Sequence, residues 1–308
     1  MKAGDTKGTN KVSQGESTDV PDTDTVITNR EKNASSNTVT IETNDKNDKV
    51  EVTLKDVNID TSSRNKAAVS VTGEGDTNIK LDGDNALKSD IYRSGIYGSG
   101  SGSLTISGGT VTANGDDGGR GISSSGSVTI SGGSTVTANG GNGTISGGDG
   151  ICSNGGVTIS GGSTVTANGG NGGSLVGGDG IRSGGGLTVS DGTVTAKGGN
   201  GDSKDGYGGD GIRSGGVITI SGNTVNAAGG YGGKVGGYGI CSFDRVAISG
   251  GTVEAAGGNG STGGGSGIYS SVIDLSGSLE LTAKAGSPNG KALSQNGREL
   301  DLNAIKDK

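Results

Sequence analysis

The sequence contains no histidine, no tryptophan and a single phenylalanine among its 308 residues. Without histidine there can be no Ser-His-Asp triad, no histidine-ligated zinc site and no imidazole that titrates near neutral pH. Only 27% of the residues are hydrophobic, which excludes the wide aromatic and leucine-rich core of an ordinary α/β enzyme. With two prolines the chain is not collagen either, because collagen needs abundant proline and a glycine at every third position.

Positive charge and long apolar runs are also scarce. The 25 Lys and Arg residues are outnumbered by 32 Asp and Glu residues, giving a net charge of -7. No run of five basic residues occurs, so we expect no nucleic-acid partner. No apolar stretch reaches the length of a signal-peptide core or of a membrane span, and we expect neither in the chain as given.

Glycine, in contrast, supplies 70 residues, and its distribution divides the chain near position 95. Up to residue 37 the chain is polar with no sustained hydrophobic period, which predicts a disordered leader or linker. From Thr38 onward, short segments place aliphatic residues two apart, as half-buried strands do. We expect less regular coils over 38–94, regular repeats over 95–290 and a C-terminal cap over 291–308.

A repeat of 26 to 31 residues begins at successive Gly-Ile pairs, at Gly95, Gly121, Gly150, Gly180, Gly211, Gly239 and Gly267. The unit GICSNGGVTISGGSTVTANGGNGGSLVGGD, at 150–179, contains three strand-like pieces separated by glycine pairs. Strands this short are stable only when each unit stacks on its neighbours. The sequence therefore predicts an all-β fold, a right-handed parallel β-helix with three short strands per coil and about 9–10 coils.

Alternation along the strands predicts which side chains face inward. Four aliphatic columns should form the core; they begin at Ile96, Leu104, Ile106 and Val111 and recur in each of the seven repeats. The position after each Gly-Ile should face outward, because it carries Arg182 and Arg213 in adjacent coils. Cys152 and Cys241 share this position three coils apart, about 14 Å along the axis, too far for a disulfide. We expect both to be free surface thiols.

Asp149, Asp179 and Asp210 precede Gly-Ile in successive units and should stack about 5 Å apart. Three carboxylates in a row repel one another unless something compensates their charge. Calcium is one candidate, since it prefers oxygen ligands at flexible turns. The alternative is that each Asp caps its own turn by accepting backbone N–H groups, with Arg182 and Arg213 as counter-charges.

Three further patterns lie outside the core columns. Tyr207, Tyr231 and Tyr238 fall in long loops near Arg182 and Arg213, where rings and cations could bind an acidic sugar chain, although loop packing also explains them. Stacked asparagines predict structural amide ladders at Asn114, Asn139 and Asn168 and at Asn142, Asn171, Asn200 and Asn259. A threonine array resembles the flat faces of ice-binding β-solenoids, although threonine is also a common strand surface residue; it contains Thr110, Thr112, Thr135, Thr137, Thr164, Thr166, Thr193 and Thr195.

The units that end in GGDGI and continue VTISGGSTVTA resemble a family of secreted bacterial β-helix proteins described as carbohydrate-binding domains, which are similar in fold to pectate lyases. The resemblance covers the chain from Thr38 onward. It implies calcium-assisted, non-catalytic binding of polygalacturonate-like polysaccharide outside the cell or at its surface. On the family motif, the calcium ligands fall on Asp149, Asp179 and Asp210. The other coils depart from it, with Arg120, Tyr238 and Ser266 at this place.

Two other functions fit the same sequence. A pectate-lyase-like enzyme would need acidic calcium ligands and a Lys or Arg base in one groove, and Asp179, Asp210, Arg182 and Arg213 could supply them. A single active site normally interrupts a repeat, whereas these residues belong to it. A surface adhesin or structural spacer would use the same fold without glycan affinity. In each case we expect a monomer.

Overall fold

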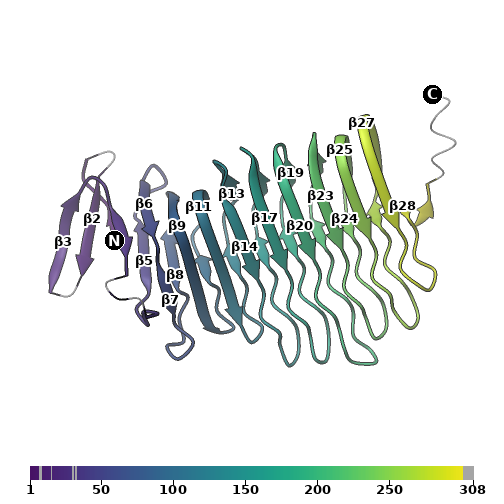
Figure 1. Ribbon diagram of the computed structural model, residues 1–308, viewed down its shortest axis with the longest axis horizontal. Helices are drawn as coiled ribbons and strands as arrows, with labels where there is room; N and C mark the ends of the chain where they lie inside the picture. Colours follow the sequence, from purple (N-terminus) through teal and green to yellow (C-terminus); the bar gives the residue numbers. More distant parts are fainter. Residues whose placement is uncertain (7–8, 15, 30, 32, 301–308) are drawn as a thin grey trace.

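The computed structural model describes residues 1–300 apart from residues 7, 8, 15, 30 and 32, and the end of the predicted C-terminal cap, 301–308, lies outside these described residues. Within them all regular structure is β. Parallel strands stack along one axis into a solenoid of about ten turns (Figure 1). The sequence-based prediction of a parallel β-helix with three strands per coil is confirmed.

The first strand of each coil belongs to one sheet, called sheet A here. Its members along the solenoid are β5 (Val39–Thr43), β8 (Val69–Gly73), β10 (Ile96–Gly98), β12 (Ile122–Ser124), β15 (Ile151–Ser153), β18 (Ile181–Ser183), β21 (Ile212–Ser214), β24 (Ile240–Ser242), β26 (Ile268–Ser270) and β28 (Leu293–Gln295). A short strand, β29 (Arg298–Glu299), pairs antiparallel with β28 and covers the last edge of sheet A among the described residues.

The second and third strands of each coil share sheet B. Four strands run through both positions: β9 (Asp76–Ile91), β11 (Leu104–Asp116), β25 (Arg245–Ala256) and β27 (Val272–Lys284). Elsewhere a turn separates the two positions, giving β6 (Lys49–Lys55), β7 (Asn58–Asp60), β13 (Val128–Ser131), β14 (Thr135–Asn139), β16 (Val157–Ile159), β17 (Ser163–Asn168), β19 (Leu187–Val189), β20 (Gly192–Lys197), β22 (Ile218–Ile220) and β23 (Asn223–Ala228). Gly161 and Gly162, both at positive φ, form one of these turns, in a conformation that side-chain-bearing residues rarely adopt.

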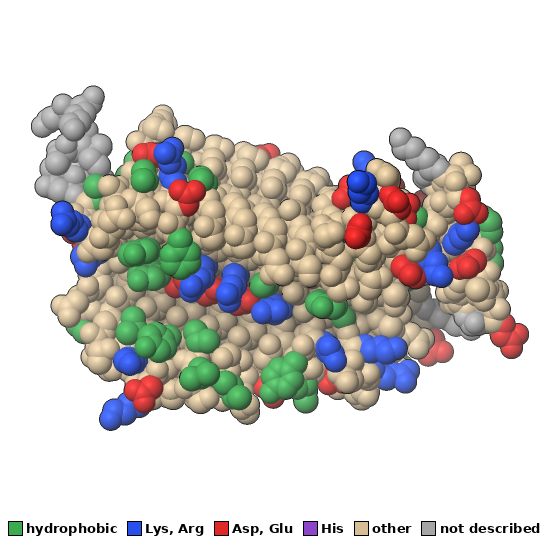
Figure 2. All heavy atoms as spheres, turned by 180° about the vertical axis from the view of Figure 1, so that it is seen from behind, with side chains coloured by type: hydrophobic (Ala, Val, Ile, Leu, Met, Phe, Trp, Pro, Cys, Tyr) green, Lys and Arg blue, Asp and Glu red, His purple; other side chains and the backbone are tan. Residues whose placement is uncertain are grey.

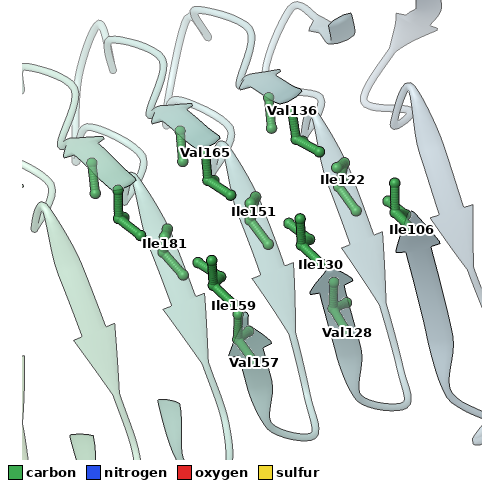
Figure 3. Packing of buried hydrophobic residues seen from close by; sticks show 14 of the residues in the cluster. Ile106, Ile122, Val128, Ile130, Val136, Ile151, Val157, Ile159, Val165 and Ile181 are labelled. Carbon is green, nitrogen blue, oxygen red and sulfur yellow. The ribbon is translucent and has the colours of Figure 1, made fainter. Parts of the chain in front are cut away.

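The pairing register stacks each repeat on the next without a slip in sheet A, so that Ile151 lies opposite Ile122 on one side and Ile181 on the other. All four predicted aliphatic columns are buried except at Leu275 and Leu281, which are half-buried because β27 is the last strand of sheet B among the described residues (Figure 3). A fifth inward column is made of alanines: Ala113, Ala138, Ala167, Ala196, Ala227 and Ala255. Buried aliphatic contacts and parallel backbone ladders together hold the coils in register.

Residues 1–37, expected to be disordered, contain four strands: β1 (Lys2–Ala3), β2 (Asn10–Gln14), β3 (Ser17–Asp22) and β4 (Val26–Thr28). The first three extend the open edge of sheet A, with β2 and β3 as an antiparallel hairpin, and β4 pairs with β6 in sheet B. Strand pairing at a sheet edge uses backbone groups, so it needs no hydrophobic period. Buried Asn10 adds side-chain hydrogen bonds to Thr25 and to the Glu51 carbonyl.

The glycine pairs of the long loops are explained by how closely the coils approach one another. A Cβ atom at Gly178 would collide with the backbone carbonyl of Gly148 in the preceding coil, and one at Gly148 would collide with that of Gly119. The loops after the third strand therefore stack backbone on backbone, held by N–H donors such as Gly170 N to Gly148 O at 2.8 Å.

Candidate functional site

The outer face of sheet A carries a line of charged residues from successive repeats. Each coil reads X-Gly-Ile-X there. The second X alternates with the buried isoleucine and faces outward. The first X reaches the same face, because Asp210 contacts Arg213 and Tyr238 stacks on Tyr269. We call the charged members the Arg-Asp row: Arg120, Asp149, Asp179, Arg182, Asp210 and Arg213. Figure 2 shows basic and acidic side chains in one line along the middle of this face, in a shallow hollow, with hydrophobic side chains beside them.

The three aspartates form a hydrogen-bonded ladder that runs from coil to coil. Asp149 Oδ1 accepts the backbone N–H of Asp179 at 2.9 Å, and Asp179 Oδ1 accepts that of Asp210 at 2.7 Å. The ladder continues to the next coil, where Tyr238 N–H donates to Asp210 Oδ1 at 2.7 Å. The three aspartate residues are 4–6% exposed and therefore buried, whereas Arg120 and Arg182 of the same row are exposed.

Two of the three aspartates are paired with an arginine. Arg120 Nε lies 3.1 Å from Asp149 Oδ2, and Arg213 Nη1 lies 3.5 Å from Asp210 Oδ2. The guanidinium of Arg213 also stacks over the ring of Phe243, 5.1 Å from its centroid. Arg182 is exposed and, among the described residues, forms no ion pair. The alternative in which arginines supply the counter-charges to the aspartates fits Arg213, whereas Arg120 takes the place expected of Arg182.

This arrangement changes the acidity of the row. Burial, with Asp210 and Asp149 as charged neighbours, raises the pKa of Asp179 to about 8. Burial also raises the pKa of Asp210, to about 6, while the N–H of Tyr238 and the charge of Arg213 limit the rise. The middle carboxyl therefore keeps its proton at neutral pH, which relieves the repulsion that the sequence predicted along the column.

Asparagine ladders follow the same design and are confirmed. Asn142 Oδ1 accepts the N–H of Asn171 at 2.8 Å, and Asn171 Oδ1 accepts that of Asn200 at 2.9 Å. In the other column the amides bond to each other, Asn139 to Asn114 and Asn168 to Asn139, both at 2.8 Å. The Asp ladder thus makes the same bond from side-chain oxygen to backbone N–H as the Asn142 ladder, with carboxyl groups in place of amides.

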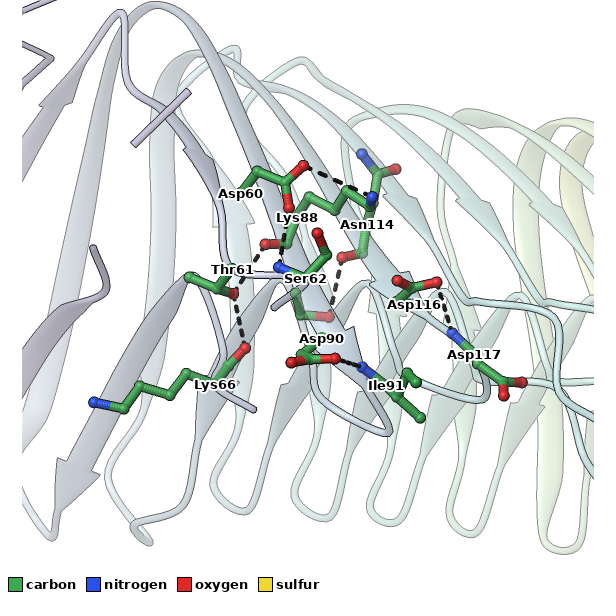
Figure 4. A network of polar contacts seen from close by, with 11 residues as sticks. Asp60, Thr61, Ser62, Lys66, Lys88, Asp90, Ile91, Asn114, Asp116 and Asp117 are labelled. Atoms are coloured by element: carbon green, nitrogen blue, oxygen red, sulfur yellow. Dashed lines mark hydrogen bonds and ion pairs between the residues drawn. The ribbon is translucent and has the colours of Figure 1, made fainter. Parts of the chain in front are cut away.

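Another polar network joins the less regular coils to the repeats (Figure 4). Thr61 Oγ1 donates to the carbonyl of Lys66 at 2.8 Å, and Ser89 Oγ lies 3.3 Å from the carbonyl of Asn114. Lys88 reaches Asp60 at 3.7 Å. These groups bond to one another and to backbone carbonyls, so the network holds neighbouring coils together.

Calcium, expected at Asp149, Asp179 and Asp210, has no gathered ligand set in the structure. Across the described residues, no three Asp, Glu, Cys or His side chains lie together as a metal ion would require. One oxygen of each aspartate accepts a backbone N–H, and Asp149 and Asp210 also bind arginine. A cation would have to displace these partners. Calcium binding stays a prediction, and the alternative of N–H capping fits the geometry, with the bonds made to the next coil.

The three predicted tyrosines divide between two places. Tyr238 follows Asp210 in the row and stacks on Tyr269, with ring centroids 4.9 Å apart and planes at 20°. Tyr207 and Tyr231 lie on the loops, 45% and 47% exposed, and Lys234 Nζ lies 5.7 Å from the Tyr207 ring centroid. Exposed Ile145 and Leu175 occupy the same loops in preceding coils. We call Ile145, Leu175, Tyr207 and Tyr231 the loop ridge.

Three contributors were missed at the sequence level: Arg120, Tyr269 and Phe243. Arg120 occupies the X-Gly-Ile position that carries aspartate in the next coil, so the repeat alignment contained the information. Tyr269 follows a Gly-Ile pair and was expected to face outward, whereas its partner Tyr238 precedes a Gly-Ile pair. The two tyrosines therefore belong to different columns of the repeat alignment. Phe243 follows a buried serine and had no repeat counterpart.

Cys152 and Cys241 are free, as expected, but the prediction that they lie on the surface is wrong. Their exposed fractions are 7% and 1%. The reason is that each cysteine has larger side chains beside it in register: Arg182 beside Cys152, and Arg213 and Tyr269 beside Cys241. Burial raises the pKa of Cys152 to about 11 and that of Cys241 to about 12, with the nearest aspartates adding to the shift.

The threonine array lies on the outer face of the third strands, in sheet B. Its two columns are paired in register from β11 through β14 and β17 to β20. Asn226 and Glu254 interrupt one column beyond that point. Ice binding through this face stays a prediction.

The fold and the outward columns define a parallel β-solenoid repeat protein, consistent with a pectate-lyase-like β-helix. Comparison with protein-family models, with curated proteins and with solved structures finds no match for this chain. No helix in the described part of the chain is long and apolar enough to cross a membrane.

Proposed function

We propose that this protein is a non-catalytic polysaccharide-binding protein that acts outside the cell or at its surface and prefers acidic glycans. The observation that carries the proposal is the outer face of sheet A, where exposed and half-buried arginines and aromatic rings follow one line along the coils. A regular surface of this kind offers repeated contacts to a ligand that is itself a repeat.

The chemistry of the face suits a sugar acid. A guanidinium binds a carboxylate through paired, charge-assisted hydrogen bonds. The stacked rings of Tyr238 and Tyr269 and the exposed ring of Phe243 present apolar area to the apolar face of a sugar ring. The resemblance to the secreted carbohydrate-binding β-helix family supports the same class of ligand.

A binding role is favoured over catalysis by what the carboxylates do. Asp149, Asp179 and Asp210 are buried and accept backbone N–H groups of the next coil. In the lyase considered above these carboxylates would hold calcium, and for that they would have to give up backbone N–H groups and, at Asp149 and Asp210, arginine partners. The same three aspartates suggested that calcium assists binding. The hydrogen-bonded ladder does not need calcium, so the experiment below compares binding with calcium and with a chelator.

The test is titration of the full chain with polygalacturonate, and with its fully methyl-esterified form as the uncharged control. Each is done with calcium and with a chelator, while absorbance at 235 nm reports unsaturated products. We expect saturable binding of the acidic polymer without growth of absorbance. Growing absorbance would identify a lyase. Absence of saturable binding to either polymer would refute the proposal and favour an adhesin or structural spacer.

A further inference from the structure

The Arg-Asp row holds three cations and three carboxyl groups, so its net charge is zero if all six are ionised. Such a row would have no excess charge with which to attract an acidic ligand. Whether it can bind one depends on how the protein distributes its own counter-charges among the three arginines.

Two arginines are already committed. Arg120 reaches the buried carboxylate of Asp149 at 3.1 Å. Arg213 reaches Asp210 and stacks over Phe243, which restrains its guanidinium at two places. Withdrawing either arginine would leave a buried carboxylate without its partner, which is costly.

Arg182 is in a different position. Its side chain is exposed, it pairs in register with Cys152 on one side and with Arg213 on the other, and no carboxylate among the described residues lies within ion-pair distance. Asp210, the nearest ionised carboxylate, feels the charge of Arg182 but forms its ion pair with Arg213. The aspartate of its own coil, Asp179, gives one oxygen to the N–H of Asp210, and burial raises its pKa. The middle of the row therefore presents one exposed guanidinium that has no ion-pair partner among the described residues.

We propose that Arg182 is the residue that receives the acidic group of the ligand, and that Arg120 and Arg213 are held by the protein's own carboxylates. This inference rests on the proposed polysaccharide binding and names the specificity-determining residue within it. A carboxylate of the polymer takes the position opposite Arg182 that an internal aspartate takes opposite its two neighbours. Neutral sugars gain nothing from this contact, so Arg182 separates acidic from neutral chains.

The test compares Arg182→Gln, Arg213→Gln and Arg245→Gln in the full chain. Arg245 is an exposed control that pairs with Asp274 at 3.3 Å on another strand. Polygalacturonate and its methyl ester are titrated at pH 7, and each variant is melted. We expect Arg182→Gln to bind polygalacturonate about 10-fold or more weakly, with unchanged affinity for the ester and unchanged melting temperature. Arg213→Gln should chiefly lower the melting temperature, and Arg245→Gln should change neither quantity.

Reaction with phenylglyoxal gives a second readout. Arg182 should be modified faster than Arg120 and Arg213, and polygalacturonate should protect it. If Arg182→Gln binds polygalacturonate as tightly as the wild type, or melts as low as Arg213→Gln, the inference is overturned while polysaccharide binding stands. If the wild type binds neither polymer, the proposed function fails and takes the inference with it.

Discussion

Replacing Asp179 by asparagine should stabilise the protein, and the gain should grow with pH. The amide keeps the Oδ1 acceptor that binds Asp210 N–H, because Asn142 and Asn171 make the same bond in the neighbouring ladder. It removes the ionisable proton and the repulsion from Asp149 and Asp210. The substitution therefore isolates the electrostatic part of the ladder from its hydrogen bonds.

The sign follows from the two pKa values. In the unfolded chain Asp179 titrates near its ordinary value of 3.8, whereas in the folded protein its pKa is about 8. Below pH 4 both states hold the proton and the group does not affect folding. Between the two values the unfolded state alone releases the proton, so the wild type loses about 1.4 kcal/mol of stability per pH unit. Over the whole window the loss reaches a ceiling of about 6 kcal/mol, and above pH 8 it no longer changes.

The assay is urea unfolding of wild type and Asp179→Asn at each pH unit from 4 to 9. We expect similar midpoints at pH 4 and a difference that widens in favour of the variant up to about pH 8. Asp179→Ala is the matched control, since it removes the acceptor as well and leaves the Asp210 N–H without a partner, which destabilises at every pH.

Parallel pH profiles for the wild type and Asp179→Asn would refute the reasoning. So would a variant that is less stable than the wild type at pH 8. In either case the middle carboxylate would have to be ionised and compensated in the folded protein, by Arg182 or by a bound cation, and the charge balance assigned to the row would be wrong.

Three further changes test other parts of the structure. Gly178→Ala should strongly destabilise or prevent folding, because its Cβ would collide with the backbone of the preceding coil, whereas Gly263→Ala, which has room, should unfold at nearly the same urea concentration as the wild type. Ile151→Ala should cost about 2–5 kcal/mol of unfolding free energy in urea titrations, since the stacked coils leave the cavity unfilled; a cost below 1 kcal/mol would contradict the packing. Cys152 and Cys241 should react with iodoacetamide at pH 8 at least 10-fold more slowly in the folded protein than in urea, because their raised pKa values leave little thiolate, and equal rates would show that they are exposed.

The repeats were predictable because one physical constraint acts on every coil. A column of aliphatic residues such as Ile122, Ile151 and Ile181 can be aligned by spacing alone, and spacing determines both register and facing in a parallel solenoid. Outward columns could be aligned equally well, which is why the Asp ladder and the asparagine ladders were located correctly.

Residue spacing could not predict that a long side chain would cover a short one beside it. Cys152 occupies an outward position and is nevertheless buried, because Arg182 and other larger neighbours lie over it. The pairing of Arg120 with Asp149 crosses from one coil to the next and depends on rotamers rather than on register. The strands within residues 1–37 could not be predicted for a related reason: β2, β3 and β4 are formed by backbone pairing at sheet edges, which leaves little trace in hydropathy.

The coil-to-coil bonding of this solenoid has a consequence for how such a protein can evolve. In the central repeats a coil presents to the next the same ladder acceptor and the same inward columns that it receives from the one before. A duplicated unit can therefore be spliced in between two existing ones with no new interface to invent, lengthening the molecule by about 4.8 Å. Unequal recombination within the gene would then change the number of coils, and with it the length of the outer face, one repeat at a time.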